Sequence, residues 1–196
     1  MSTVHAGMTM SLDGFVADRH GGTARLSDPA TANGSEYMAE LIRETGAVVL
    51  GRRTFAMAED PDRFVGNYEF QVPIFVVTHT PPDVLPKQDE RLTFTFVTDG
   101  IASAVARAKA AAGDRAVKVI GASVVRQALR AGLADEVHVD IAPVLLGAGL
   151  PLFGDPELDG VVLRRIGVRE VGTFTSLRFE VVSPPIVGGK PSLEGR

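Results

Sequence analysis

The chain has 196 residues, 45% of them hydrophobic, which is enough for one well-covered core. The net charge of −4 and the scattered basic residues argue against a nucleic-acid partner. With no cysteine, the sequence excludes disulfides, thiolate metal sites and a cysteine nucleophile. The N-terminal residues do not have the pattern of a signal peptide, and no segment has the roughly 18 consecutive apolar residues of a membrane span. We therefore expect a cytoplasmic protein with no membrane partner.

In the first hundred residues, short apolar runs alternate with helix signals. Strands are expected at 4–10, 47–50, 73–78 and 93–98. Asn33 or Ser35 is expected to cap a helix that runs to about Thr45 and that Gly46 ends. Its inward residues are expected to be Tyr37, Met38, Leu41 and Ile42. The polar loop 18–34 is long for a compact domain, and whether it acts as a lid over an active site stays open.

The second half of the chain continues the alternation and then changes to strands alone. Asp99 is expected to cap a helix over about 101–112, which Gly113 ends. An apolar run from Val117 stops at Gly121, and an amphipathic helix begins within two residues and closes at Gly132. A long strand is expected at 136–146, then a loop at 147–151, and then an antiparallel hairpin of 161–171 and 174–182 that turns near Gly172.

This order predicts an α/β fold: a mostly parallel central sheet with helices on both faces and a C-terminal antiparallel hairpin. Residues 1–183 are expected to form a single domain. Residues 184–196, rich in Pro, Gly, Lys and Ser, are expected to form a loose C-terminal tail.

Two joints between a strand and a helix carry the functional signal. In the stretch Val117–Leu129 the strand turns through Gly121 directly into a helix, which aims free backbone N–H groups at one point and attracts anions. A second joint, Val48–Phe55, adds the guanidinium groups of Arg52 and Arg53. Glycine at such joints can also serve the turn alone, and the two arginines can be plain surface charge. Together the two joints suggest a cofactor with several phosphates.

Five short motifs, in this order, resemble the dihydrofolate reductase-like superfamily and in particular the C-terminal reductase domain of the riboflavin-biosynthesis protein RibD. The motifs are Met10–Ala17, Gly51–Phe55, Val76–His79, Val119–Val125 and Ile141–Gly147. The resemblance covers nearly the whole chain up to about Val182. It implies a dihydrofolate reductase-like fold and an NADPH-dependent reductase without a metal, which passes hydride to a flat heterocycle or a sugar-derived carbon.

The resemblance also assigns roles along an extended NADPH. The cofactor residues would be Gly51, Arg52, Arg53, Thr54, Thr78, His79, Gly121, Ala122, Ser123, Val124 and Val125. Arg52 or Arg53 would bind the 2′-phosphate that distinguishes NADPH from NADH, and the amides of 121–125 would hold the pyrophosphate. Ala122 stands where the superfamily typically has a second glycine. The nicotinamide side would be lined by Met10, Ser11, Asp13 and Ala17, largely through backbone groups.

The substrate end departs from dihydrofolate reductases. Those enzymes hold the folate glutamate with an arginine just before the strand that corresponds to 74–78, where this chain has no basic residue in 69–73. Folate is therefore disfavoured as the substrate. Glu36 lies near the position of the superfamily's acidic residue on the first helix, but an ordinary first-turn acid explains it equally. Asp13 is the other weak catalytic candidate, and it can simply stabilise the turn before Gly14.

Three functions remain open for the chain. The first is an NADPH-dependent reductase of a small heterocyclic or ribosylaminopyrimidine-like compound. The others are a weak dihydrofolate reductase and a non-catalytic nucleotide-binding protein that kept the fold. The strand 136–146 could serve a homodimer interface or lie inside the sheet. The four histidines are widely separated along the chain, so no metal site is expected.

Overall fold

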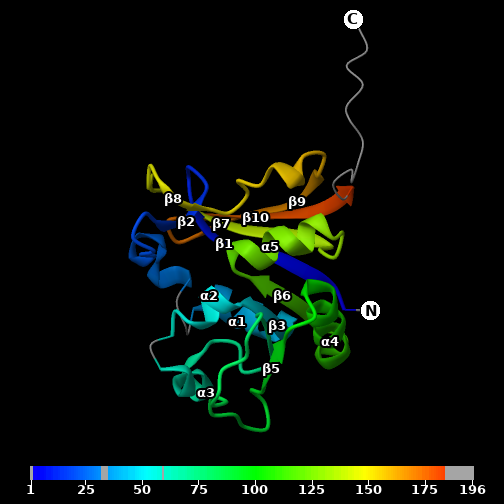
Figure 1. The fold of residues 1–196 in the computed structure, drawn as a ribbon. Helices are drawn as coiled ribbons and strands as arrows, with labels where there is room; N and C mark the ends of the chain where they lie inside the picture. Colours follow the sequence, from blue (N-terminus) through cyan, green and yellow to red (C-terminus); the bar gives the residue numbers. More distant parts are fainter. Residues whose placement is uncertain (1, 32–34, 59, 184–196) are drawn as a thin grey trace, which may run out of the picture.

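A computed structural model describes residues 2–31, 35–58 and 60–183 of the chain (Figure 1). An eight-stranded sheet runs through the molecule in the order β5-β4-β3-β6-β1-β7-β10-β9. Its strands are β1 (Val4–Ser11), β3 (Thr45–Gly51), β4 (Ile74–Val77), β5 (Phe94–Val97), β6 (Ala116–Ile120), β7 (Glu136–Ala142), β9 (Val162–Val171) and β10 (Phe174–Ser183). The pairs from β5 to β7 are all parallel, whereas β10 is antiparallel to both β7 and β9. The predicted fold class, a mostly parallel sheet with a C-terminal antiparallel hairpin, is confirmed.

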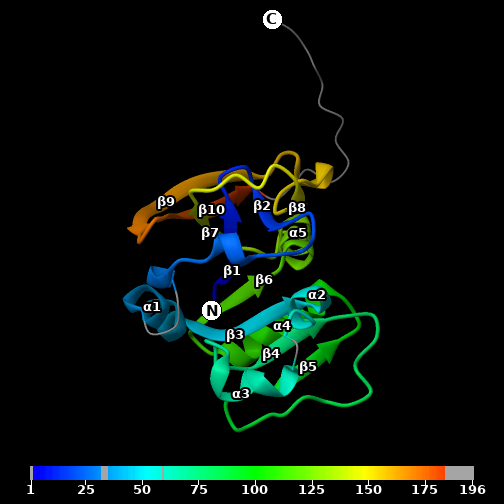
Figure 2. The ribbon, with the colours of Figure 1, turned by 90° about the vertical axis from the view of Figure 1, so that its left-hand side faces the viewer.

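Helices cover both faces of this sheet (Figure 2). The helices α4 (Ile101–Ala112) and α5 (Ala122–Arg130) pack on one face, where alternate strand residues such as Ala47 and Val49 point toward them. The helix α1 (Glu36–Glu44) and the single turns α2 (Arg52–Phe55) and α3 (Phe64–Asn67) lie on the other face, against Val48 and Leu50. Every residue of β3 is buried, as a strand between two helical layers requires.

The face of α5 that the sequence predicts to be apolar packs on the sheet. Val124, Val125, Ala128 and Leu129 are all buried. Burying a valine or leucine side chain stabilises the fold by roughly 1.5–3 kcal/mol, so this short helix is held mainly by its inner face. Arg126 and Arg130 are half-buried rather than fully in water, because Arg126 donates to the carbonyl oxygen of Pro151 and Arg130 pairs with Asp155 and Glu157.

Several predicted boundaries differ in the structure. Ser35 caps α1 and was one of the two predicted caps. The other, Asn33, lies outside the described residues. The helix ends one residue earlier than expected, because Thr45 already begins β3 and Gly46 lies within the strand. Ile42 was expected to face inward but is exposed. Gly100, not Asp99, is the N-cap of α4, while Gly113 ends this helix as predicted.

The long strand predicted at 136–146 ends at Ala142, and the loop predicted at 147–151 contains a strand. This strand, β8 (Gly149–Pro151), pairs with β2 (Phe15–Asp18) in a small separate sheet. Asp13 holds the intervening segment, since its carboxylate accepts hydrogen bonds from the backbone N–H groups of Leu146 and Gly147. The segment after β7 therefore turns back toward the N-terminal turn instead of extending the large sheet.

The loop predicted at 18–34 is partly ordered in its described portion. It contains two single 3-10 turns, Ala24–Leu26 and Pro29–Thr31. The Asp28 carboxylate accepts hydrogen bonds from the backbone N–H and hydroxyl of Thr173, which ties the loop to the turn of the β9–β10 hairpin. Leu26 is buried next to Ala142 and Phe174. The described part of the loop is thus tied to the β9–β10 hairpin, and the question of a lid stays open.

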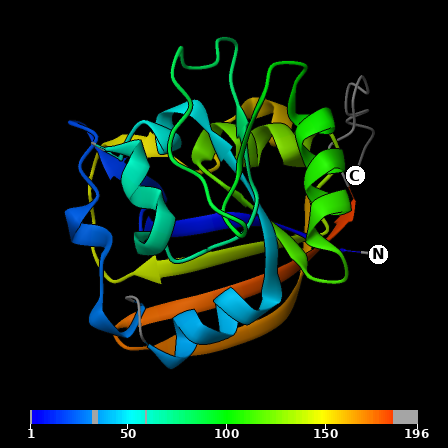
Figure 3. The same ribbon diagram turned by 90° about the horizontal axis from the view of Figure 1, so that it is seen from below.

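The hairpin forms one edge of the large sheet and lies next to α1 (Figure 3). Glu40 of α1 pairs with Arg169 and Arg178, and Glu44 also pairs with Arg178. The outer strand β9 exposes apolar side chains at Val162, Ile166 and Val168. The expected homodimer stays a prediction, as does the C-terminal tail, which lies outside the described residues. Among the described residues, no helix is long and apolar enough to cross a membrane.

Candidate functional site

Both strand–helix joints open into one cavity of about 590 Å³ at the carboxyl ends of β3, β4 and β6. The cavity brings together ten of the eleven residues predicted to bind a cofactor: Gly51, Arg52, Arg53, Thr54, Thr78, His79, Gly121, Ala122, Ser123 and Val124. Val125, the eleventh, is fully buried on the inner face of α5 and does not line the cavity. Thr98, Gly100, Arg126 and Gln127 also line it. We call it the joint cavity.

At the first joint, Gly121 lies very close to Thr54 of α2. Its φ of +113° is one that side chains rarely adopt, and a Cβ atom at this position would lie 2.4 Å from Thr54 Oγ1. Only glycine therefore lets β6 turn into α5 this close to α2. The peptide between Gly121 and Ala122 is trans. The first N–H groups of the nine-residue α5 have no partners within the helix and open at this turn.

At the second joint, the arginine side chains matter more for anion binding than the start of the helix does. Because α2 is one turn long, its few backbone N–H groups supply little dipole, and the exposed guanidinium groups of Arg52 and Arg53 supply the positive charge. Among the ion pairs of the described residues, none involves either arginine. Both guanidinium groups are thus available to an anion in the joint cavity.

Thr78 and His79 border the joint cavity from the end of β4. Thr78 is buried, and its hydroxyl both donates to the carbonyl oxygen of Thr80 and accepts from the Thr80 N–H. It therefore fixes the bend after the strand. His79 is exposed on the cavity side of this bend.

A second cavity of about 380 Å³ lies next to the first, on the α1 face of the sheet. Thr54 lines both, so the two cavities meet at the α2 turn. The walls of the second cavity are largely apolar and include Met38, Leu41, Met57 and Phe70. The loop residues Thr23, Leu26 and Ser27 close one side. We call it the floor cavity, because polar side chains of the sheet form its base.

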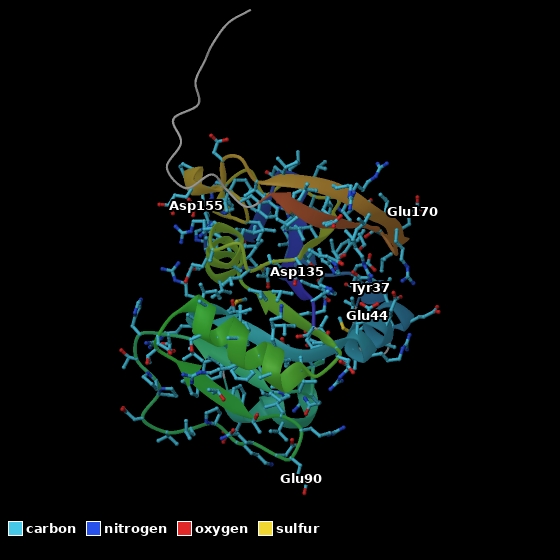
Figure 4. The ribbon with its side chains drawn as sticks, turned by 90° about the vertical axis from the view of Figure 1, so that its right-hand side faces the viewer. Tyr37, Glu44, Glu90, Asp135, Asp155 and Glu170 are labelled. Carbon is cyan, nitrogen blue, oxygen red and sulfur yellow. The ribbon has the colours of Figure 1, made fainter. Side chains whose placement is uncertain are left out.

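The polar base of the floor cavity comes from three neighbouring strands. Lys118 on β6 stands next to His5 on β1, and His138 and Asp140 lie on β7. Burial lowers the pKa of Lys118 to about 8, against the opposing effects of Asp140 and Glu44. Figure 4 shows Tyr37 and Glu44 on the side of α1 that lies next to the strands. An unusual concentration of ionisable groups thus lies within the sheet.

Tyr37 joins α1 to this base. Its hydroxyl donates to Asp140 Oδ1 at 2.7 Å and lies 3.1 Å from Ser176 Oγ on β10. Burial, together with the nearby Asp140 charge, raises the pKa of Tyr37 well above its ordinary value. The phenol therefore stays protonated and acts as a hydrogen-bond donor that orients the Asp140 carboxylate.

Two histidine rings lie against each other, tilted by 30°, at the inner end of the same base. The rings of His5 and His138 have centroids 4.2 Å apart, and Glu136 Oε2 lies 2.6 Å from His138 Nε2. Burial lowers the pKa of each histidine to about 3, so both rings are neutral at physiological pH. The expectation of no metal site was based on spacing along the chain, and this spacing says nothing about residues that paired strands bring together.

The residues predicted at the nicotinamide side lie outside both cavities. Met10 packs against the main core, and Ala17 is buried in β2 opposite Leu150. The buried Ser11 hydroxyl donates to Asp13, whose pKa falls to about 2, mainly because of this hydrogen bond. Asp13 therefore stabilises the turn, which was the simpler of its two interpretations. Met8, Thr9 and Val16 of the neighbouring positions do line the floor cavity.

Glu36, the other catalytic candidate, is exposed in the first turn of α1 and lines neither cavity. The next residue, Tyr37, enters the floor cavity instead. Sequence reasoning also missed Lys118, His138 and Asp140. For Lys118 a signal was present, because it is the one ionisable residue in the otherwise apolar strand β6, where a lysine is rarely buried without a partner or a function. His138 and Asp140 gave no such signal, because β7 alternates polar and apolar residues as a half-buried strand does.

Comparison with known proteins places this arrangement in a family. The chain is 27% identical over 172 residues to YwjB of Bacillus subtilis, an uncharacterized protein, with 88% of this chain and 94% of YwjB covered. A protein of Shewanella sp. PV-4 that its description links to riboflavin biosynthesis has a TM-score of 0.73 at 23% identity, over 91% of this chain and 98% of that one.

A protein of Thermotoga maritima has a TM-score of 0.66. Its name describes a combined deaminase and reductase of phosphoribosylaminopyrimidines. The identity is 16%, with 92% of this chain and 56% of the Thermotoga chain covered. At these identities the solved structures show the fold alone. The family model described as the RibD C-terminal domain matches residues 2–177, nearly the whole chain. The chain belongs to the RibD C-terminal domain family.

Proposed function

We propose that the protein is an NADPH-dependent reductase that passes hydride to a small heterocyclic or ribosylaminopyrimidine-like substrate. One observation carries this proposal: the joint cavity, with its two arginines and glycine turns, meets the floor cavity at Thr54. An anionic cofactor and a small polar substrate can therefore approach each other at one residue. The reductase names of several structural neighbours support the same reaction class.

The residues of the joint cavity fit NADPH. The open amides at Ala122 and Ser123 would bind the pyrophosphate at the start of α5. Arg52 or Arg53 would hold the 2′-phosphate through paired N–H donors. When bound, NADPH supplies the hydride, so the chain needs to position the substrate rather than form a covalent bond to it.

The floor cavity suits a small substrate with several hydrogen-bonding groups. Asp140, held by Tyr37, offers carboxylate acceptors, and Lys118 offers a buried donor. The apolar walls exclude water from the surface of a flat ring. These features would orient a heterocycle with its reactive carbon toward Thr54, where the nicotinamide end of the cofactor would enter.

The alternative of a weak dihydrofolate reductase is disfavoured by Glu69. This residue lines the floor cavity, and burial raises its pKa. Folate carries a glutamate carboxylate, and here it would meet an acidic side chain instead of a guanidinium group. The third possibility, a nucleotide-binding protein without turnover, differs from the proposal only in the absence of hydride transfer.

Thermal shift with NADPH and NADH tests the cofactor directly. We expect millimolar NADPH to raise the melting temperature of the wild-type protein more than NADH does, because a ligand that binds only the folded state stabilises it. Replacing Arg52 and Arg53 by alanine should remove most of this difference, since NADH has no 2′-phosphate. The exposed Arg115 precedes β6 at the end of that strand opposite Gly121 and lines neither cavity, so Arg115→Ala gives the matched control.

Two results would contradict the proposal. If NADPH gives no stabilisation of the wild-type protein, the cofactor assignment fails. If Arg52→Ala and Arg53→Ala weaken NADPH and NADH equally, the 2′-phosphate role is wrong although the cavity can still bind a dinucleotide. Stabilisation by NADPH without oxidation of NADPH in a screen of pterins, pyrimidines and quinoid compounds would favour the non-catalytic alternative.

A further inference from the structure

Three side chains form a compact set of metal-type donors, two of them lining the floor cavity and the third lying next to it. His5, Glu136 and His138 each place a ligand atom within 4.8 Å of the others. Glu136 Oε2 lies 2.6 Å from His138 Nε2 and 3.8 Å from His5 Nε2. The three residues come from β1 and β7, which pair directly, with His5 opposite Glu136 in the register. The sheet backbone therefore holds the three side chains close together.

The spacing is close to what a tetrahedral ion requires. Zinc bonds to nitrogen and carboxylate oxygen are about 2.0–2.2 Å long, so neighbouring ligand atoms lie roughly 3.3 Å apart around the metal. The two measured separations, 2.6 and 3.8 Å, fall on either side of this value. Small side-chain rotations would equalise them without a change in the strands.

One of the two ring nitrogens of His5 has no partner in the described part of the chain. His5 Nδ1 is buried and has no hydrogen-bond partner among the described residues. A buried polar atom without a partner destabilises the fold, so native structures usually satisfy such atoms with protein, water or an ion. The His5 side chain is only 11% exposed, and that of His138 is 12% exposed. His5 Nε2, the nitrogen that lies 3.8 Å from Glu136, also lies 3.0 Å from Thr3 Oγ1, so the atom without a partner is the second nitrogen of the same ring.

We propose that His5, Glu136 and His138 bind a divalent transition-metal ion of the zinc type. Two imidazole nitrogens and one carboxylate oxygen match the donor preference of such ions. This inference is independent of the proposed reductase function. It concerns a site that lies apart from the joint cavity, because none of the three residues lines that cavity.

The ion would be accessible from the cavity side. His5 and His138 line the floor cavity, whereas Glu136 lines a separate surface hollow next to Thr3 and Glu180. Three protein ligands leave at least one coordination position of a tetrahedral ion to water or another molecule. An oxygen or nitrogen atom of a compound in the floor cavity could therefore complete the coordination of the ion.

Neighbouring positive charge limits the affinity. Lys118 stands opposite His5 in the pairing of β1 with β6, and Arg178 stands opposite His138 in the pairing of β10 with β7. The same charges repel a cation. Replacing Lys118 with methionine removes one of them while keeping a similar side-chain length, so the substitution should tighten metal binding. A gain of binding is a result that mere damage to the fold does not produce.

Titration of purified, chelator-treated protein with Co²⁺ tests the site, since tetrahedral Co²⁺ gives visible absorption bands that report its ligands. We expect one Co²⁺ per chain, displaced by Zn²⁺. Glu136→Gln and His138→Gln should each weaken binding by more than about 100-fold, because even residues behind the metal ligands contribute 10–100-fold in affinity. Lys118→Met should bind several-fold more tightly than wild type. His20→Gln, in the exposed loop, is the matched control and should bind as wild type does.

Three outcomes would overturn the inference: no tetrahedral Co²⁺ spectrum with the wild-type protein, equal binding by wild type and both ligand variants, or a loss of binding in His20→Gln that matches theirs. Circular dichroism of each variant checks that it is folded. If Glu136→Gln fails to fold, His138→Gln and the gain in Lys118→Met still decide the outcome. The NADPH thermal shift is a separate measurement, so failure of the metal site and failure of the reductase proposal can be told apart.

Discussion

Replacing Gly121 with alanine tests whether the joint between β6 and α5 depends on glycine. The substitution adds one methyl group at a φ of +113° and 2.4 Å from Thr54 Oγ1. Two separate costs therefore act at this position: the backbone must hold a conformation that alanine disfavours, and the new methyl overlaps a hydroxyl of a residue that borders both cavities.

Both costs can be estimated from the structure. A non-glycine residue in a sparsely populated backbone region costs of order 1–3 kcal/mol. Real Cβ contacts are essentially never under 3.0 Å, so the Thr54 hydroxyl or the joint must shift by about 0.6 Å or more. Overpacking of this kind typically costs about 1–3 kcal/mol. We therefore expect Gly121→Ala to lower the free energy of unfolding by about 2–6 kcal/mol.

A double-mutant cycle separates the two costs. In urea unfolding, Thr54→Ala should recover the overlap part of the Gly121→Ala loss, whereas the backbone part should remain. Gly100→Ala is the matched control for stability, because Gly100 has a φ of +96° and no atom lies within 4 Å of the place that its new methyl group would take. Equal losses for Gly121→Ala and Gly100→Ala, with no coupling to Thr54, would refute the argument that close contact requires glycine here.

Three further substitutions test the polar base and the N-terminal turn. Burial lowers the pKa of Lys118 to about 8, below the 10.5 of a free lysine, so the unfolded chain keeps this proton to higher pH than the folded chain does. Relative to Lys118→Met, wild-type stability should therefore rise by about 3 kcal/mol between these two pKa values; a flat difference in urea unfolding across that pH range would contradict it. Tyr37→Phe removes the donor to Asp140 and should cost about 1.5–3 kcal/mol in the same assay; unchanged stability would show that water replaces the phenol. Asp13→Asn should speed amide hydrogen exchange at Gly147 with little change elsewhere, since the carboxylate accepts that N–H at 2.7 Å; unchanged exchange at Gly147 would refute the role of Asp13 in holding the segment.

The joint cavity could be predicted because its parts are local in the sequence. A glycine between an apolar run and an amphipathic run marks a turn from strand to helix, as at Gly51 and Gly121. Parallel strands put their carboxyl ends at one edge, so two such turns were expected to lie close together. The prediction required only the order of elements and not the register of any strand pair.

The polar base of the floor cavity could not be predicted in the same way. Lys118, His5 and His138 stand on three different strands, and they meet only because β1 lies between β6 and β7. The sequence does not show this order, since β6 and β1 are more than a hundred residues apart. The short strands β2 and β8 were missed for a related reason, because four and three residues are too few to display an alternating pattern.

One face of the central strands packs in the core, and the other face lines the floor cavity. On β1, Val4 and Ala6 are fully buried against α4 and α5, while the alternate residue His5 faces the floor cavity. A one-residue slip in the pairing of β1 would exchange these faces and bury His5 in the apolar core. The packing of Val4 and Ala6 therefore also fixes the position of His5 in the polar base. The Gly121–Thr54 contact lies at the edge where this face meets the joint cavity. Under the proposed function, Gly121→Ala should thus displace Thr54 and disturb substrate binding as well as cofactor binding, whereas Arg52→Ala should disturb the cofactor alone.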